Sequence, residues 1–299
     1  MSREATFIAS LRALATTPAA RNLDDDCAVL DLGGETLILT HDMLVEGTHY
    51  LQGADMADVA WKLVATNLSD LAAKGAEPLG VLLGHMLGDG DDRFLDGLAD
   101  VLGHYNVPLL GGDTVSGPTG SVGPRSHGLT AIGRATHKPV PSRAGAKVGD
   151  GVWLTGQVGA AMLGFEALKN IIGRDQTGVD HSAYSRPMAR LAEGQALAPL
   201  VTAMMDVSDG LLLDAFRLGE ASHVSIAIES IVVPVAARDR RRECLTWGDD
   251  YELLFTLPNN CKLAISATRI GTVEPRGAAP LILDDEPLSN PDGLGYAHD

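Results

Sequence analysis

The sequence predicts an α/β protein of the α+β type with two domains. Its 299 residues exceed the usual size of one domain. Strand-like runs alternate with segments whose apolar residues recur at helical spacing. A stretch rich in proline and basic residues, 134–149, lies near the middle and is expected to connect the domains. We therefore expect one domain over residues 1–137 and a second over residues 138–299.

A helix and a hairpin are expected first. Apolar residues at helical spacing indicate a helix over residues 2–15. The strand-like runs 27–32 and 36–40 are joined by Gly33-Gly34, which is typical of a β-hairpin. A two-residue turn would set Asp25 opposite Asp42, and a three-residue loop would set Asp26 opposite Asp42.

In both registers, carboxylates from two strands meet at the open end of this hairpin. Directly opposed like charges destabilise a sheet, so such a pair requires a cation, solvent or a raised pKa. Mg²⁺ commonly takes one or two carboxylates together with the phosphates of a substrate. The hairpin end is therefore a candidate magnesium site, and a loop of solvated aspartates is the alternative.

The other elements follow from apolar spacing and from glycine positions. A helix is expected over residues 58–74, and Gly75 is expected to end it. Further along we expect a helix over 91–104, strands over 107–110 and 151–155, a Gly/Ala-rich helix through Lys169, and strands over 225–229 and 253–257.

Composition excludes several classes of protein. The chain has 23 basic and 39 acidic residues, a net charge of −16, so it has no basic footprint for nucleic acid or for an anionic membrane surface. An anionic ligand would need a cation between itself and the protein, and a metal ion is the natural choice. The three cysteines are scattered, which suits a reducing cytoplasm. Arg3, Glu4 and Arg12 argue against a signal peptide.

Familiar catalytic motifs are absent. The dipeptide Gly-Lys does not occur, so there is no Walker-type phosphate loop. The dinucleotide fingerprint, the nucleophile elbow and the zincin motif are missing as well. What remains is a set of aspartates near the ends of expected elements.

Each of these aspartates has a structural alternative. Asp70 by itself is best explained as a surface ion pair with Lys74. Asp113 follows two glycines in an expected turn whose N–H groups could hold a phosphate, or it lies in an ordinary turn. The segment 206–210 carries two aspartates and Ser208, and it could equally provide the N-cap of a helix.

Taken together, these segments resemble thiamine-monophosphate kinase, a family within the superfamily of aminoimidazole-ribonucleotide synthetase. They occur in the family's order and extend over nearly the whole chain. The segments are 25–30, 41–50, 67–76, 111–114, 206–211 and 248–254.

The resemblance implies ATP- and Mg²⁺-dependent phosphorylation of thiamine monophosphate to thiamine diphosphate, by direct in-line transfer and with several Mg²⁺ ions. It also implies a homodimer formed through the N-terminal sheet, and a second domain that completes the ATP and substrate site. The implied Mg²⁺ ligands are Asp26, Thr40, His41, Asp42, Asp70, Asp113, Asp206 and Asp209. The implied ATP contacts are Tyr105, Gly112, Asp113, Arg143 and Ser208. The implied substrate contacts are His49, Asp249 and Tyr296.

The chain departs from the family pattern at four positions: Asp24, His41, Lys74 and Asp249 stand where the family usually has Gly, Thr, Met and Glu. One alternative is another ATP-dependent enzyme of the superfamily, of the selenophosphate synthetase or aminoimidazole-ribonucleotide synthetase type. The former normally has a reactive Cys or selenocysteine and a Lys in its N-terminal segment, and neither Cys nor Lys precedes Asp24. A non-catalytic metal-binding protein is the alternative from another class.

Overall fold

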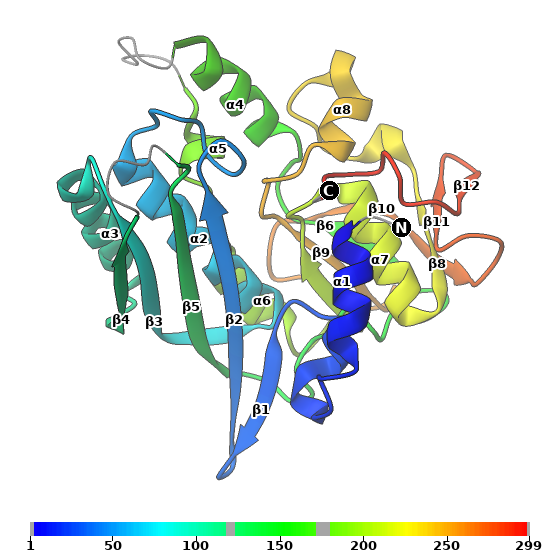
Figure 1. Cartoon of the computed structure of the whole chain (residues 1–299). Coiled ribbons are helices and arrows are strands. Elements are labelled where there is room, and N and C mark those ends of the chain that lie inside the picture. The colour runs from blue at the N-terminus through cyan, green and yellow to red at the C-terminus, as the bar shows by residue number, and fades with distance from the viewer. Residues whose placement is uncertain (1–2, 118–122, 172–179, 298–299) are drawn as a thin grey trace.

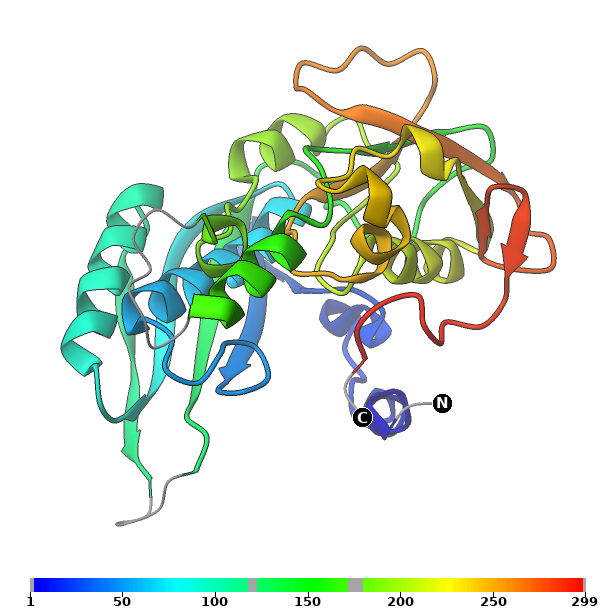
Figure 2. The same cartoon turned by 90° about the horizontal axis from the view of Figure 1, so that it is seen from above.

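The computed structural model describes residues 3–117, 123–171 and 180–297. Two β-sheets lie side by side, one built from the first half of the chain and one from the second (Figures 1 and 2). The first sheet has the order β1-β2-β5-β3-β4 and the second β12-β11-β8-β10-β6-β9-β7. Both sheets carry helices, so the structure confirms the mixed α/β class with two halves.

The elements of the first half are α1 (Arg3–Arg12), η1 (Pro18–Leu23), β1 (Ala28–Leu32), β2 (Glu35–Val45), α2 (Met56–Ala73), β3 (Ala76–Leu87), α3 (Asp91–Tyr105), β4 (Leu109–Ser116) and β5 (Ser126–Ala135). Those of the second half are β6 (Gly151–Leu154), α4 (Ala160–Ile171), α5 (Ser182–Ser185), α6 (Leu191–Leu197), β7 (Ala203–Asp206), α7 (Leu211–Ser222), β8 (Val224–Ile228), η2 (Ser230–Val232), η3 (Arg238–Arg240), α8 (Arg241–Thr246), β9 (Leu253–Leu257), β10 (Thr268–Pro275), β11 (Leu281–Leu283) and β12 (Glu286–Leu288). No helix in these described ranges is long and apolar enough to cross a bilayer.

The N-terminal hairpin has the two-residue register. Leu32 pairs with Glu35 and Ala28 with Leu39, and both turn glycines have positive φ, as this turn requires. The ladder ends at Ala28, so the prediction that Asp25 faces Asp42 is wrong. Asp25 instead accepts hydrogen bonds from Lys74 and from Arg21.

Helix α2 is the centre of the molecule. Asp55 caps its N-terminus by accepting the Ala57 N–H at 3.0 Å, and Gly75, at φ +59°, follows its last residues, as the sequence predicts. The helix packs against the first sheet and α3 on one side, and against α6 and β7 on the other. Nearly all its side chains are buried. Residues of α2 therefore reach both halves of the molecule.

Two long strands, β3 and β5, are not predicted from the sequence. Strand β3 contains Pro78 and Gly80, and β5 contains Gly128 and Gly133, residues that weaken strand patterns. The register shifts between Pro78 and Gly80. At Gly80 an added Cβ would lie within 2.5 Å of the Leu110 side chain, so the glycine there allows β3 to approach its neighbour.

The packing of α2 on α3 provides a test of these close approaches. A Cβ at Gly97, in α3, would lie 2.2 Å from the Ala57 carbonyl oxygen of α2, whereas nothing lies within 4 Å of the Cβ position at Gly103. Gly→Ala in an open helix position stabilises by about 0.5–1 kcal/mol, and overpacking typically costs about 1–3 kcal/mol. We expect Gly97→Ala to lower and Gly103→Ala to raise the free energy of unfolding in urea. Equal effects of the two would contradict this packing.

Candidate active site

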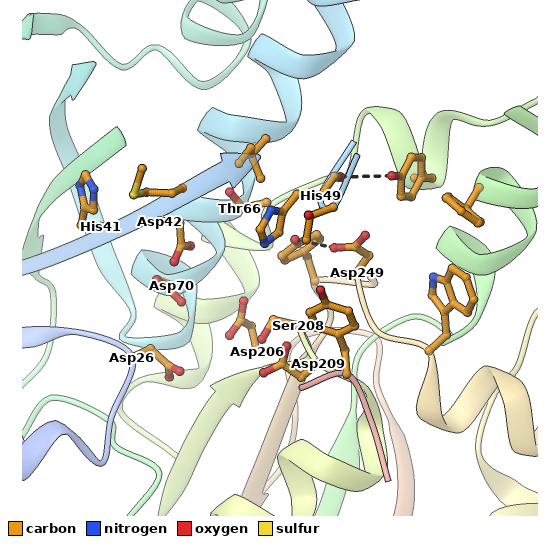
Figure 3. A pocket seen from close by; sticks show the side chains of 18 of the residues that line it. Asp26, His41, Asp42, His49, Thr66, Asp70, Asp206, Ser208, Asp209 and Asp249 are labelled. Carbon is orange, nitrogen blue, oxygen red and sulfur yellow. Dashed lines mark hydrogen bonds between the residues drawn. The ribbon is translucent and has the colours of Figure 1, made fainter. Parts of the chain in front are cut away.

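A cleft of about 680 Å³ lies where the two halves meet. Asp26, Asp42 and Asp70 line it from the first half, and Asp206, Asp209 and Asp249 line it from the second (Figure 3). The acids therefore converge from segments far apart in the sequence. The structure brings together most of the residues that sequence analysis singled out.

Three carboxylates form the tightest group. Oxygens of Asp26, Asp70 and Asp206 all lie within 4.8 Å of one another. Asp26 lies in the bend before β1, Asp70 in the last turn of α2 and Asp206 at the end of β7. The hydroxyl of Thr40 donates to Asp70, and that of Ser69 donates to Asp206 at 2.6 Å. These hydroxyls orient the carboxylates from behind and leave their other lone pairs for a ligand.

Asp42, Asp70 and Asp206 share a buried site without a protein cation. In the described part of the chain, none of these three pairs with Lys, Arg or His. Burial, with the charges of Asp26 and Asp209, raises the pKa of Asp42 to about 6. Burial, with the charge of Asp26, raises the pKa of Asp206 to about 8, and burial with Asp42 raises that of Asp70 strongly. Hard divalent cations would relieve this repulsion, so the residues fit a Mg²⁺ site.

The flanks of this group are neutralised by basic residues. Asp26 accepts hydrogen bonds from Lys74, at 3.0 Å, and from Arg143. Burial acts to raise the pKa of Asp26, but Arg143 and Lys74 outweigh it and hold that pKa low. On the other flank Arg217 pairs with Asp209 and with Asp214, the latter at 3.1 Å. Uncompensated charge is therefore confined to the middle of the cluster.

The opposite end of the cleft is aromatic. Phe165, Tyr184 and Trp247 line it, with ring centroids 5.3 Å apart for Phe165 and Tyr184 and 5.2 Å for Phe165 and Trp247. Such a wall suits a flat ring. Sequence analysis found none of these three rings, because aromatic residues scattered through the chain give no signal until the fold assembles them. Tyr296 also lines the cleft, but its backbone N–H donates to the Asp209 carbonyl oxygen at 2.9 Å, beside the acids.

Lys62 is a second residue that sequence analysis missed. Its Nζ lies 2.8 Å from Asp249 Oδ2, 3.1 Å from the His49 carbonyl oxygen and 3.8 Å from the centroid of the Tyr184 ring. The Tyr251 hydroxyl donates to the other oxygen of Asp249 at 2.9 Å, and Tyr184 donates to the His49 carbonyl at 3.1 Å (Figure 3). Asp249 and His49 are thus held in one network at the aromatic end.

Three of the expected site residues lie away from the cleft of this chain. Gly112 and Asp113 belong to β4, at the far edge of the first sheet, so the prediction that they form a turn is wrong. Asp113 is exposed there. The Tyr105 hydroxyl accepts the Ala189 N–H at 2.8 Å. Of the remaining expected residues, Thr40 is buried behind Asp70, and His41, His49, Arg143, Ser208, Asp209, Asp249 and Tyr296 line the cleft.

Two structural alternatives are also wrong. Lys74 does not pair with Asp70, because it turns to Asp25 and Asp26. Neither Ser208 nor Asp209 is an N-cap, because Gly210 holds that position before α7. The N–H groups of Ser208 and Asp209 instead donate to Asp214, each at 3.1 Å. The segment is therefore fixed from behind, which leaves Ser208 and Asp209 facing the cleft.

Two family models match most of the chain. The AIR synthase related protein N-terminal domain matches residues 24–135, and the corresponding C-terminal domain matches residues 147–281. The two sheets and the acidic cleft between them therefore define an AIR synthase related protein.

Similarity to known proteins identifies the family within this class. The thiamine-monophosphate kinase of Escherichia coli (strain K12) is 36% identical over 303 residues, which cover 92% of this chain and 91% of the relative. The complex of AaThiL with AMPPCP and TMP superposes with a TM-score of 0.83 at 25% identity, covering 95% and 94% of the two chains. The thiamine-monophosphate kinase from Stenotrophomonas maltophilia K279a superposes with a TM-score of 0.75 at 28% identity, and the match covers 95% of this chain and 96% of that one. The chain belongs to the thiamine-monophosphate kinase family.

The raised pKa of Asp42 predicts a pH-dependent instability without metal. A carboxyl whose pKa is raised by folding stabilises the fold while protonated, and this contribution is lost as pH rises through about 6. In EDTA, Asp42→Asn should match wild type near pH 4 and exceed it at pH 8 by roughly 1–3 kcal/mol in the free energy of unfolding. Urea unfolding across this pH range measures it.

Asp25→Asn is the matched control. Burial acts to raise the pKa of Asp25, but Lys74 outweighs it and the pKa is lowered, so this substitution should destabilise the protein at neutral pH. An Asp42→Asn variant that is also less stable than wild type at pH 8 in EDTA would show that Asp42 is a structural aspartate.

Proposed function

We propose that this chain transfers the γ-phosphoryl group of ATP to thiamine monophosphate, giving thiamine diphosphate, with Mg²⁺ as the required metal. One observation carries the proposal. One cleft combines an aromatic wall that has an acid of its own with buried acids that pair with no cation among the described residues. The first end suits phosphates bridged by metal, and the second suits a flat cationic ring. Membership of the thiamine-monophosphate kinase family supports the same activity.

At the acidic end, Asp26, Asp42, Asp70, Asp206 and Asp209 are the proposed Mg²⁺ ligands. These carboxylates would hold Mg²⁺, and the metal would supply the positive charge that neutralises the phosphates of donor and acceptor. The acceptor is a phosphate, which is already ionised near neutral pH, so no general base is needed. Arg143 lines the cleft and is the proposed contact to an ATP phosphate, and the Ser208 hydroxyl faces the same space. The residues of this end position the reactants and hold charge.

At the aromatic end, we propose that the rings of thiamine pack against the wall formed by Phe165, Tyr184 and Trp247. The thiazolium ring is cationic, and aromatic faces attract cations. Asp249 adds a negative charge, partly offset by Lys62. His49 and Tyr296 complete the proposed substrate contacts.

We further propose that residues 1–137 form a dimerising domain and residues 138–299 a second domain. Helices α2 and α3 cover one face of the first sheet, and the other face carries exposed Leu82, Leu110 and Val115 (Figure 1). On that face Met43, Gly128, Gly84 and Asp113 are consecutive partners across four strands. A second copy packed on this face would bury the apolar residues and bring its Gly112 and Asp113 toward the cleft.

The activity is tested by ATP consumption with and without thiamine monophosphate, and by direct detection of thiamine diphosphate. We expect turnover only with thiamine monophosphate and Mg²⁺ present. Asp42→Asn should lower kcat about 100-fold or more, as expected when charge stabilisation of a transition state is lost. Asp31→Asn, an exposed acid of the same hairpin, is the control and should keep wild-type turnover. An equal rate of ATP consumption with and without thiamine monophosphate would refute the proposal.

The dimer is tested by sedimentation at micromolar concentration. Wild type should be a dimer, and Leu82→Lys, which places a charge on the open face of the sheet, should be a monomer because burying an unpaired charge is costly. Leu95→Lys changes an equally apolar, exposed side chain on α3 and should remain a dimer. A monomeric wild type, or loss of the dimer in both variants, would contradict the proposed interface.

A further inference from the structure

Lys74 is an unusual buried residue beside this cleft. It follows the last residue of α2, its side chain has no exposed surface, and its Nζ hydrogen-bonds to Asp25 Oδ1 and, at 3.0 Å, to Asp26 Oδ2. A buried ammonium group is stable only where carboxylates compensate its charge. These two carboxylates are themselves almost fully buried. Lys74 and the two aspartates therefore form a fixed charge network within the wall of the cleft.

The acidic cluster divides into two parts with different charge balance. Asp25 and Asp26 are compensated by Arg21, Lys74 and Arg143. Asp42, Asp70 and Asp206 have no such partner among the described residues. Asp26 joins the parts, since its carboxylate contacts Lys74 and also lies within 4.8 Å of oxygens of Asp70 and Asp206.

The two cations that hold Asp26 differ in exposure. Arg143 binds Asp26 Oδ1, lines the cleft and keeps 17% of its side chain exposed, so it can turn toward a phosphate and release that oxygen. Lys74 binds Oδ2, and its side chain is fully buried just after the end of α2, so it is packed more tightly in place than Arg143. Asp26 can therefore offer Oδ1 to a metal ion while Oδ2 remains with Lys74.

We propose that Lys74 is a built-in cation of the metal site, a positioning residue that takes the place of one divalent ion beside Asp25 and Asp26 and restricts Asp26 to ligation through one oxygen. This inference rests on the proposed function for the identity of the metal. If Lys74 has this role, the chain binds fewer divalent ions than the same carboxylates would bind without Lys74. The same role also explains why Asp25, which does not line the cleft, is paired as strongly as Asp26.

The test uses the full-length protein stripped of metal, with neither ATP nor thiamine monophosphate present. Lys74→Met removes the charge and keeps an unbranched side chain of similar length. In EDTA this variant should melt several degrees below wild type, because Asp25 and Asp26 lose their shared cation. Added Mg²⁺ should raise its melting temperature more than that of wild type. Equilibrium dialysis with Mn²⁺, a cation that accepts the same oxygen ligands, should find about one more ion per chain than in wild type.

Two control variants separate this role from a purely structural one. Lys74→Arg keeps the positive charge and should retain the wild-type response to Mg²⁺ and the wild-type number of bound Mn²⁺ ions. Arg21→Met removes another cation from Asp25 but leaves Asp26 untouched, since Arg21 otherwise contacts the carbonyl oxygens of Val140 and Pro141. It should melt below wild type by the same amount with and without Mg²⁺.

The proposal is overturned if Lys74→Met loses equal stability in EDTA and in Mg²⁺, if it binds no more Mn²⁺ than wild type, or if it stays unfolded in saturating Mg²⁺. These outcomes are independent of the kinase assay. Unchanged metal binding with normal formation of thiamine diphosphate would refute the role of Lys74 alone. The expected metal binding without any formation of thiamine diphosphate would refute the proposed function alone.

Discussion

Repulsion among carboxylates buried between the two sheets is the constraint on which the rest of this structure depends. Asp70 adds to it by lying in the last turn of α2, where the negative end of the helix dipole opposes another negative charge. The hydroxyls of Thr40 and Ser69 donate hydrogen bonds to Asp70 and Asp206, which reduces the free-energy cost of burying these carboxylates together but does not remove it. Such an arrangement is stable only with a cation in the middle or with protons retained, and the raised pKa values of Asp42 and Asp206 reflect the second condition.

Helix α2 connects the acidic end of the cleft to its aromatic end. Lys62, Thr66 and Asp70 recur every fourth residue of α2, and Lys74 continues this spacing just after the helix ends, so the four form one polar stripe along an element that is otherwise packed on all sides. Lys62 meets Asp249 at the aromatic end and Asp70 meets Asp206 and Asp26 at the acidic end. Eight residues of helix separate these two positions by about 12 Å along the axis. One rigid element thus sets the separation between the two ends of the cleft.

Local signals in the sequence predict local features correctly. The two glycines imply a hairpin, although they leave its register open, and Gly75 implies the end of α2, because each of these features depends on neighbouring residues only. The partners of Lys74 depend instead on the bend at 25–27. The position of Asp113 depends on β3, a strand that Pro78 and Gly80 make hard to predict. A pattern read along the chain cannot identify such partners. Family resemblance supplied the acidic residues of the site, and only the fold could supply Lys62 and the aromatic wall.

The acids can be held close together because the contact beneath them is apolar and tight. Ala72 and Ala73, in the last turn of α2, pack against Leu197, Met204 and Phe255 of the second half. A Cβ at Gly194 would lie 2.0 Å from the Ala72 carbonyl oxygen, and one at Gly75 would lie 2.4 Å from the Ala198 Cβ. Backbone from the two halves therefore meets directly under the cluster, without room for adjustment. Burial of apolar surface at this junction opposes the repulsion above it and holds oxygens of Asp26, Asp70 and Asp206 within 4.8 Å of one another.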